Sequence, residues 1–302
     1  MIELGVLGEL TVRVDRLEVG LKAPMVRRLL AVLLTRAGHP VPVSTLIDAL
    51  WQGERPQNSH KTLQVYILRL RQALGDAMRI RRHAGGYAVV VGPGELDAQR
   101  FEDLVAQGRH ARHAGEPEQA SQLFTGALSL WRGAPYADVA EAGLVDEEVR
   151  RLEEARLALQ EERIGVDLEL GWHSGLVPEL DALVAAHPYR EELRAQLMLA
   201  LYRTGRRREA LEVYRSTRRM LREELGIEPR PGLLALHERI LRADPGLEPR
   251  PAVLPSGPAV AGRPGRPPSR QFLKTMESVG GRASHVACLT PCHRNRVRPP
   301  EV

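Results

Sequence analysis

The sequence predicts a mainly α-helical chain in which a small N-terminal α+β domain precedes an all-α domain of helical repeats. Three observations predict it. The apolar residues have a period of two at both ends of residues 1–92 and a period near 3.6 between them. Residues 97–244 show helical spacing and no strand pattern. Within that stretch a glycine, an alanine five residues later and an aromatic residue four further on occur twice.

The predicted strands come first. Apolar and polar residues alternate through the first 21 residues, and a turn near Asp15 and Arg16 divides the pattern. This alternation predicts strands with one buried face. The apolar positions are Leu10, Val12 and Val14 before the turn and Leu17, Val19 and Leu21 after it.

Three helices and a hairpin follow. Pro24 begins the first helix and Gly38 ends it, which are the positions that proline and glycine favour. The second helix spans about residues 44–50 and the third about residues 59–74, both with apolar residues at helical spacing. Residues 79–82 and 87–91 flank a glycine-containing turn and predict a β-hairpin. This order is the layout of a winged helix-turn-helix, which we place at residues 1–93.

The second domain, at residues 97–245, has the pattern of tetratricopeptide-like helix pairs. Its repeated positions are Gly115, Ala120 and Phe124 in one copy and Gly205, Ala210 and Tyr214 in the other. Gly171 lies 34 residues before Gly205, which is the tetratricopeptide period. Small residues let paired helices approach closely, and the aromatic residue packs into the next pair. Residues 249–302 form a tail rich in Pro and Arg that we expect to be disordered.

Charge differs between these parts. Residues 1–92 carry 13 Lys and Arg against 7 Asp and Glu, a net charge of +6, whereas residues 93–250 carry −7 and residues 251–302 carry +6. A basic first domain points to a polyanionic partner, although charged runs are also ordinary solvated surface. The only cysteines, Cys288 and Cys292, lie in the tail, which fits a reducing compartment. We find no signal peptide or membrane span and expect a cytoplasmic protein without membrane contact.

The helix at residues 59–74 is the candidate element for reading DNA. Arg and Gln make bidentate contacts to base edges in the major groove, and small apolar groups contact thymine methyls. The solvated face of an ordinary amphipathic helix is the alternative interpretation. The candidate DNA-contacting residues on this helix are Lys61, Gln64, Val65, Leu68, Arg69 and Gln72.

More cations flank this helix. Arg79, Arg81 and Arg82 lie in the predicted hairpin, and an arginine-rich wing suits the minor groove or the DNA backbone. An edge strand charged against aggregation is the alternative. Arg27 and Arg28, near the start of the first helix, are candidate phosphate contacts or solvated surface.

Longer stretches resemble a known family. RLLAVLLTRAGHPVPVSTLIDALW, NSHKTLQVYILRLRQALG and HAGGYAVVV are similar to the OmpR/PhoB-type winged helix of the SARP regulators. ALSLWRGAPYADV and the run from LMLALYRTGR to LREELGIEP are similar to the bacterial transcriptional activator domain of the same family. The resemblance covers roughly residues 1–245.

The resemblance implies a transcriptional activator of antibiotic, or secondary-metabolite, biosynthesis gene clusters. Such proteins bind direct repeats near the promoter as dimers or small oligomers and recruit RNA polymerase through its sigma factor. The loop after the second helix often takes part, which would assign Trp51, Glu54 and Arg55 to a polymerase-facing surface. A core position is the alternative for Trp51. Leu68 stands where the family commonly has a small polar residue, which puts the operator sequence in doubt, and Tyr136 replaces a more usual Leu.

Other functions fit the sequence less well. A two-component response regulator would need a receiver domain before the winged helix, which starts at residue 2. A peptide-binding repeat scaffold is the main alternative without DNA, and the basic first domain argues against it. We find no metalloprotease, hydrolase or P-loop motif and expect no enzyme, catalytic residue or cofactor. The tail has the spacing H-x₂-C-x₃-C-H at residues 285–293 without a surrounding core, and we expect no metal site there.

Overall fold

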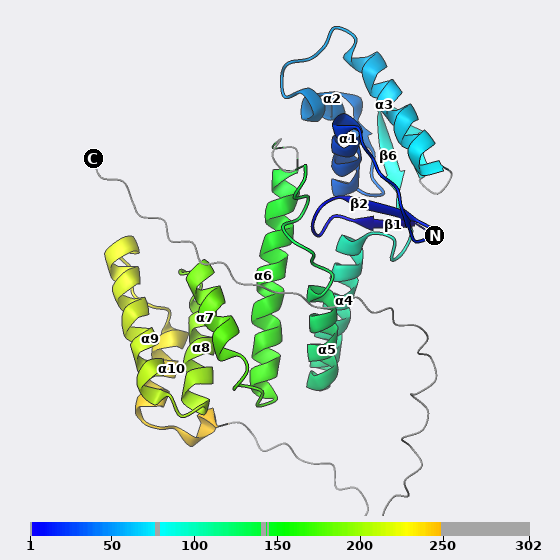
Figure 1. Ribbon diagram of the computed structural model, residues 1–302. Coiled ribbons are helices and arrows are strands. Elements are labelled where there is room, and N and C mark those ends of the chain that lie inside the picture. The colour runs from blue at the N-terminus through cyan, green and yellow to red at the C-terminus, as the bar shows by residue number, and fades with distance from the viewer. Residues whose placement is uncertain (1, 76–78, 140–142, 144, 249–302) are drawn as a thin grey trace, which may run out of the picture. The chain divides into compact units, whose positions relative to one another are not determined.

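The computed structural model describes residues 2–75, 79–139, 143 and 145–248. The predicted order of elements is confirmed: strands, three helices and a hairpin, then an all-helical domain (Figure 1). The tail at residues 249–302, with its predicted disorder and its Cys and His residues, lies outside the described residues.

The N-terminal sheet has the order β1-β2-β3, with strands Ile2–Gly5, Thr11–Val14 and Leu17–Glu18. Both pairs are antiparallel, with Ile2 opposite Val14. The turn falls at Asp15 and Arg16, as predicted, and both have positive φ. The prediction of a buried face is wrong for Leu17, which is 74% exposed. It lies in a two-residue strand at the edge of the sheet, where the alternation does not reveal whether anything covers it.

The helix-turn-helix consists of α1 (Pro24–Thr35), α2 (Val43–Trp51) and α3 (Ser59–Leu74). Their apolar faces meet in one core, as the helical spacing predicted. Gly38 follows α1 with φ of 82°, a conformation that favours glycine. The core residues of these helices that are at most 3% exposed are Leu29, Leu30, Ala31, Leu33, Leu34, Leu46, Ile47, Leu50, Leu63, Ile67, Leu70 and Leu74.

A second sheet has the order β4-β6-β5, with strands Val41–Pro42, Gly86–Val90 and Arg79–His83. The predicted hairpin is β5 and β6. Strand β4 was not predicted, because two residues are too few to show a period. It lies so close to the hairpin that a Cβ at Gly86 would stand 2.2 Å from the carbonyl oxygen of Val41. Glycine is therefore required at position 86.

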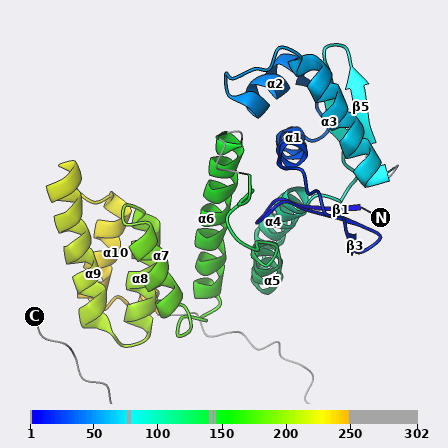
Figure 2. The same cartoon turned by 45° about the horizontal axis from the view of Figure 1, so that its top comes forward.

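Helices α4 to α10 form the second domain. Their bounds are Asp97–His113 (α4), Pro117–Leu128 (α5), Asp146–Glu169 (α6), Val177–Ala186 (α7), Glu191–Arg203 (α8), Arg207–Met220 (α9) and Pro231–Leu241 (α10). A π-helical turn, Leu221–Leu225, extends α9. Neighbouring helices pack in pairs, α4 with α5, α7 with α8 and α8 with α9 (Figure 2). None of the described helices is long and apolar enough to cross a membrane.

The repeated glycines and alanines have the roles that the spacing predicted, whereas the aromatic Phe124 packs against α4, the other helix of its own pair, rather than into the next pair. Gly115, Gly171 and Gly205 each follow a helix and have φ between 77° and 82°, the left-handed region that favours glycine. Ala120 and Ala210 are fully buried. In the first repeat a close approach also involves Gly108, where a Cβ would lie 2.4 Å from the ring of Phe124.

The long helix α6 contributes to two apolar cores. Leu152, Leu159 and Val166 belong to a core that continues through α4 and α5 into the winged helix. Leu157, Ile164 and Leu168 belong to the core of α7 to α10. Because the first core crosses from one predicted domain into the other, the winged helix and the first helical repeat pack as one unit.

Buried hydrogen bonds reinforce this junction. The Asp97 carboxylate accepts the backbone N–H groups of Val6 at 2.8 Å and Leu7 at 3.1 Å, and it meets the guanidinium of Arg132 at 3.2 Å. In return, the N–H of Arg132 donates to the carbonyl of Leu7 at 2.7 Å, and that of Tyr136 donates to the carbonyl of Val6 at 2.9 Å. Tyr136 is 1% exposed, so its side chain packs at this junction.

Candidate nucleic-acid interface

Helix α3 presents its candidate residues on one exposed side. Lys61, Gln64, Val65, Leu68, Arg69 and Gln72 are all exposed, whereas Leu63, Ile67, Leu70 and Leu74 anchor the opposite side. Val65 is 45% exposed and Leu68 53% exposed. Two large apolar side chains therefore face solvent between cations and an amide, an arrangement with the donors and apolar groups that base edges require.

The wing lies beside α3, and one hydrogen bond couples them. The guanidinium of Arg71, near the end of α3, donates to the carbonyl of Ile80 in β5 at 2.8 Å. Ile80 is buried, while Arg79, Arg81 and Arg82 on the same strand are exposed. The sequence analysis did not single out Arg71, because helical spacing does not reveal that a side chain reaches a strand.

A small cleft separates the first turns of α3 from the tip of the wing. Its volume is about 100 Å³, and its lining includes His60, Gln64, Arg82 and His83. The predicted helix and wing residues Gln64 and Arg82 therefore come together across it. His60 was missed by the sequence analysis, since a histidine in the first turn of a helix carries no distinctive signal.

The arginines near the start of α1 are placed differently. Arg27 forms an ion pair with Asp138 and also donates to the carbonyl of Leu10 at 2.7 Å. The Asp138 carboxylate in turn accepts the N–H of Leu10 at 2.6 Å. Arg27 thus has a structural role at the domain junction that neither sequence interpretation included. A phosphate contact by Arg27 or by the half-buried Arg28 stays a prediction.

Of the candidate loop residues, Glu54 and Arg55 are exposed and Trp51 is half-buried. Trp51 is the last residue of α2, and its ring stacks on that of Tyr66 in α3 with centroids 6.1 Å apart. Arg55 pairs with Asp48 of α2. These contacts hold the loop against α2 and α3, so Trp51 anchors the loop that carries the two charged residues.

The interface is cationic and only lightly neutralised by neighbouring carboxylates. Arg79 meets Glu95 at 3.5 Å, with half of the Arg79 side chain exposed. This separation is longer than a charge-assisted hydrogen bond, so Glu95 neutralises the half-exposed Arg79 only weakly. Among the described residues, no group of three or more His, Cys, Asp or Glu side chains is placed to hold a metal ion.

Two family models match the chain. The family described as "Transcriptional regulatory protein, C terminal" matches residues 21–88, and the family described as "Bacterial transcriptional activator domain" matches residues 96–241. These ranges correspond to the helix-turn-helix with its wing and to the helical domain. Both families consist of transcriptional regulators rather than enzymes.

Individual relatives extend over both domains. The chain is 40% identical over 238 residues to the regulatory protein DnrI of Streptomyces peucetius, covering 76% of this chain and 88% of DnrI. It is 46% identical to the regulatory protein AfsR of Streptomyces griseus over 72% of this chain, but it spans only 22% of AfsR. A solved structure, "Mycobacterium tuberculosis EmbR in complex with low affinity phosphopeptide", is similar with a TM-score of 0.77 and 34% identity, covering 81% of this chain and 66% of that chain.

Proposed function

Because this chain belongs to the SARP family of transcriptional regulators, we propose that it activates transcription by reading DNA with the exposed side of α3. The observation that carries the proposal is the exposure of Val65 and Leu68 among Lys61, Gln64 and Arg69. Thymine methyls and base edges in a major groove would cover both kinds of side chain. The wing arginines would then lie on the backbone or in the minor groove.

The proposed complex is a homodimer on direct repeats. Two protomers would place their α3 helices in successive major-groove sites on one side of the DNA, roughly 34–36 Å apart. We propose that these repeats lie in promoters of a secondary-metabolite, or antibiotic, biosynthesis cluster, and that the protein acts in the cytoplasm. The support is family membership and the cationic surface of the first domain.

A gel shift at two salt concentrations, with fragments from the genomic neighbourhood of the gene, tests the DNA proposal. A discrete complex is expected on one intergenic fragment. Its affinity should fall steeply with salt, because the Lys and Arg side chains that contact phosphates release counterions from the DNA. Gln64→Ala and Arg69→Ala should each weaken specific binding by about 1–3 kcal/mol, which is roughly 5- to 150-fold in Kd.

Two exposed residues outside the interface provide matched controls. Gln122→Ala in α5 and Arg208→Ala in α9 remove the same side-chain types and should leave the Kd unchanged. If the α3 variants bind as tightly as these controls, α3 does not read the DNA. A complex of equal affinity on every fragment would show nonspecific binding only.

We propose that activation proceeds through contact of the α2–α3 loop with RNA polymerase and its sigma factor. Glu54 and Arg55 are the exposed charged residues that would make this contact. Glu54→Ala and Arg55→Ala should reduce transcription in a reconstituted assay with purified polymerase while leaving the gel shift unchanged. Asp48→Asn is the control, because it weakens the Arg55 ion pair without removing Arg55. If Asp48→Asn reduces transcription as much, the loss reflects loop geometry rather than contact with the polymerase.

A further inference from the structure

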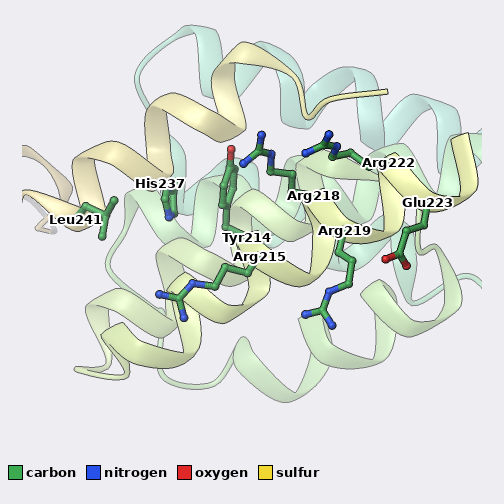
Figure 3. Close-up of a pocket in the computed structure, with 8 residues that line it drawn as sticks. All are labelled: Tyr214, Arg215, Arg218, Arg219, Arg222, Glu223, His237 and Leu241. Atoms are coloured by element: carbon green, nitrogen blue, oxygen red, sulfur yellow. The ribbon is translucent and has the colours of Figure 1, made fainter. Parts of the chain in front are cut away.

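A second cationic surface lies in the helical domain, on α9 and α10. It is an open groove of about 550 Å³ whose lining includes Arg215, Arg218, Arg219 and Arg222 (Figure 3). Figure 3 shows Arg215 and Arg219 on one side of α9 and Arg218 and Arg222 on the other. Each pair is spaced i, i+4, so its members lie one helical turn apart.

Neighbouring carboxylates leave these arginines only partly paired. Glu212 pairs with Arg215 at 3.3 Å and with Arg219 at 4.0 Å. Glu228 pairs with Arg218 at 2.7 Å and with Arg222 at 3.4 Å. Only the 2.7 Å contact of Arg218 has the length of a charge-assisted hydrogen bond, so Arg219 and Arg222 keep N–H donors for a further carboxylate. Like charges at i, i+4 also repel each other, and an anionic partner would relieve that repulsion.

The α10 side of the groove is apolar and aromatic. His237 stacks on Tyr214 of α9, with ring centroids 3.9 Å apart and an angle of 16° between the planes. Burial lowers the pKa of His237, so at neutral pH its uncharged ring lines this side of the groove. Leu234 and Leu241 are 43% and 49% exposed, and their spacing places them on the same face of α10 as His237.

A π-helical turn shapes one end of the groove. Residues Leu221–Leu225 depart from α-helical geometry at the end of α9, and Arg222 and Glu223 of this turn belong to the lining.

We propose that this groove, on the α9–α10 pair, binds an acidic amphipathic helix of a partner protein. A helix with carboxylates at i and i+4 repeats them at the same interval as the paired arginines of α9. Apolar residues on the adjoining face of that helix would cover Leu234, Leu241 and the stacked rings, as in other helix-in-groove complexes. The tail of this chain does not fit, because residues 251–302 have a net charge of +6. The proposal does not depend on DNA binding by α3.

The test uses fluorescence anisotropy with the full-length protein and a labelled 20-residue peptide of Glu, Leu and Ala. This peptide has Glu at i, i+4 and Leu on the adjoining face. Because the groove is small and open, a Kd on the order of micromolar is expected. The double variant Arg218→Ala/Arg222→Ala should weaken binding at least tenfold, and Leu241→Asp should weaken it as well. Arg208→Ala is the matched control, and circular dichroism verifies that each variant is folded.

Two control peptides and one DNA measurement complete the test. A peptide of the same composition with its Glu residues out of register, and one with Lys in place of Glu, should bind at least tenfold more weakly. Equal binding of the out-of-register peptide, or no binding of the probe at 100 µM (about −5.5 kcal/mol), would overturn the proposal. Weakened DNA affinity of the double variant would assign the arginines to the DNA footprint instead. Loss of a dimer in sedimentation would assign them to contact between two copies of this chain.

Discussion

The buried carboxylate of Asp97 should be a main determinant of the stability of the domain junction. It accepts the N–H groups of Val6 and Leu7, both of which are fully buried, and it pairs with Arg132. Asp97→Ala would leave both N–H groups without their acceptor. Each buried donor that loses its partner costs about 1–3 kcal/mol, so we expect the free energy of unfolding to fall by roughly 2–5 kcal/mol.

Denaturant unfolding followed by circular dichroism measures this loss directly. Asp103→Ala is the matched control, because Asp103 is an exposed aspartate on the same helix α4. The control should change the free energy of unfolding by less than about 0.5 kcal/mol. Asp97→Asn should lower the free energy of unfolding by an amount between the losses for Asp103→Ala and Asp97→Ala, because its amide oxygen can still accept one of the two N–H groups. A loss below about 1 kcal/mol for Asp97→Ala would refute the reasoning, because it would show that the two N–H groups find other acceptors.

Three further outcomes are expected. Gly108→Ala should lower the free energy of unfolding by about 1–3 kcal/mol, because the added Cβ would press on Phe124. This loss outweighs the higher helix propensity of alanine. Unchanged thermal stability would contradict this prediction. Arg71→Ala should weaken DNA binding about 3- to 10-fold with the fold intact, because the wing loses its hydrogen bond at Ile80, and a gel shift checks it. Burial lowers the pKa of His237 below 6.5, so the folded state favours the neutral ring. The associated stability is present above pH 6.5 and is lost as the pH falls below it. The His237→Phe variant should therefore lose less unfolding free energy between pH 7 and pH 5 than the wild-type protein does. Equal losses in the two proteins would disprove this prediction.

Two carboxylates join the helical domain directly to the winged helix. Asp97 begins α4, and Asp138 lies in the segment between α5 and α6, yet both bind backbone of the turn between β1 and β2. Asp138 also holds Arg27 of α1.

Local patterns in the sequence were sufficient to predict most elements. Helix α3 spans Ser59–Leu74 as the apolar spacing predicted, because burial on one side of a helix imposes that spacing on the sequence. The glycine turns of the repeats were equally visible, since a left-handed φ admits few other residues. The exposed side of α3, and with it the candidate interface, follows from the same periodicity.

Contacts between distant residues left no such pattern. The Arg27–Asp138 ion pair joins positions 111 residues apart, and the Asp97 carboxylate accepts a backbone N–H 91 residues away. A single charged residue in a sequence does not reveal its partner, so Arg27 was assigned only to phosphate or solvent. The groove between α9 and α10 was missed for the same reason. The sequence by itself determined most of the helices and strands and the buried side of most of them, because those are properties of neighbouring residues; the two-residue strand β4 and the exposed Leu17 are the exceptions. Only the tertiary structure decided which charged groups meet, because such pairing depends on how separate segments pack.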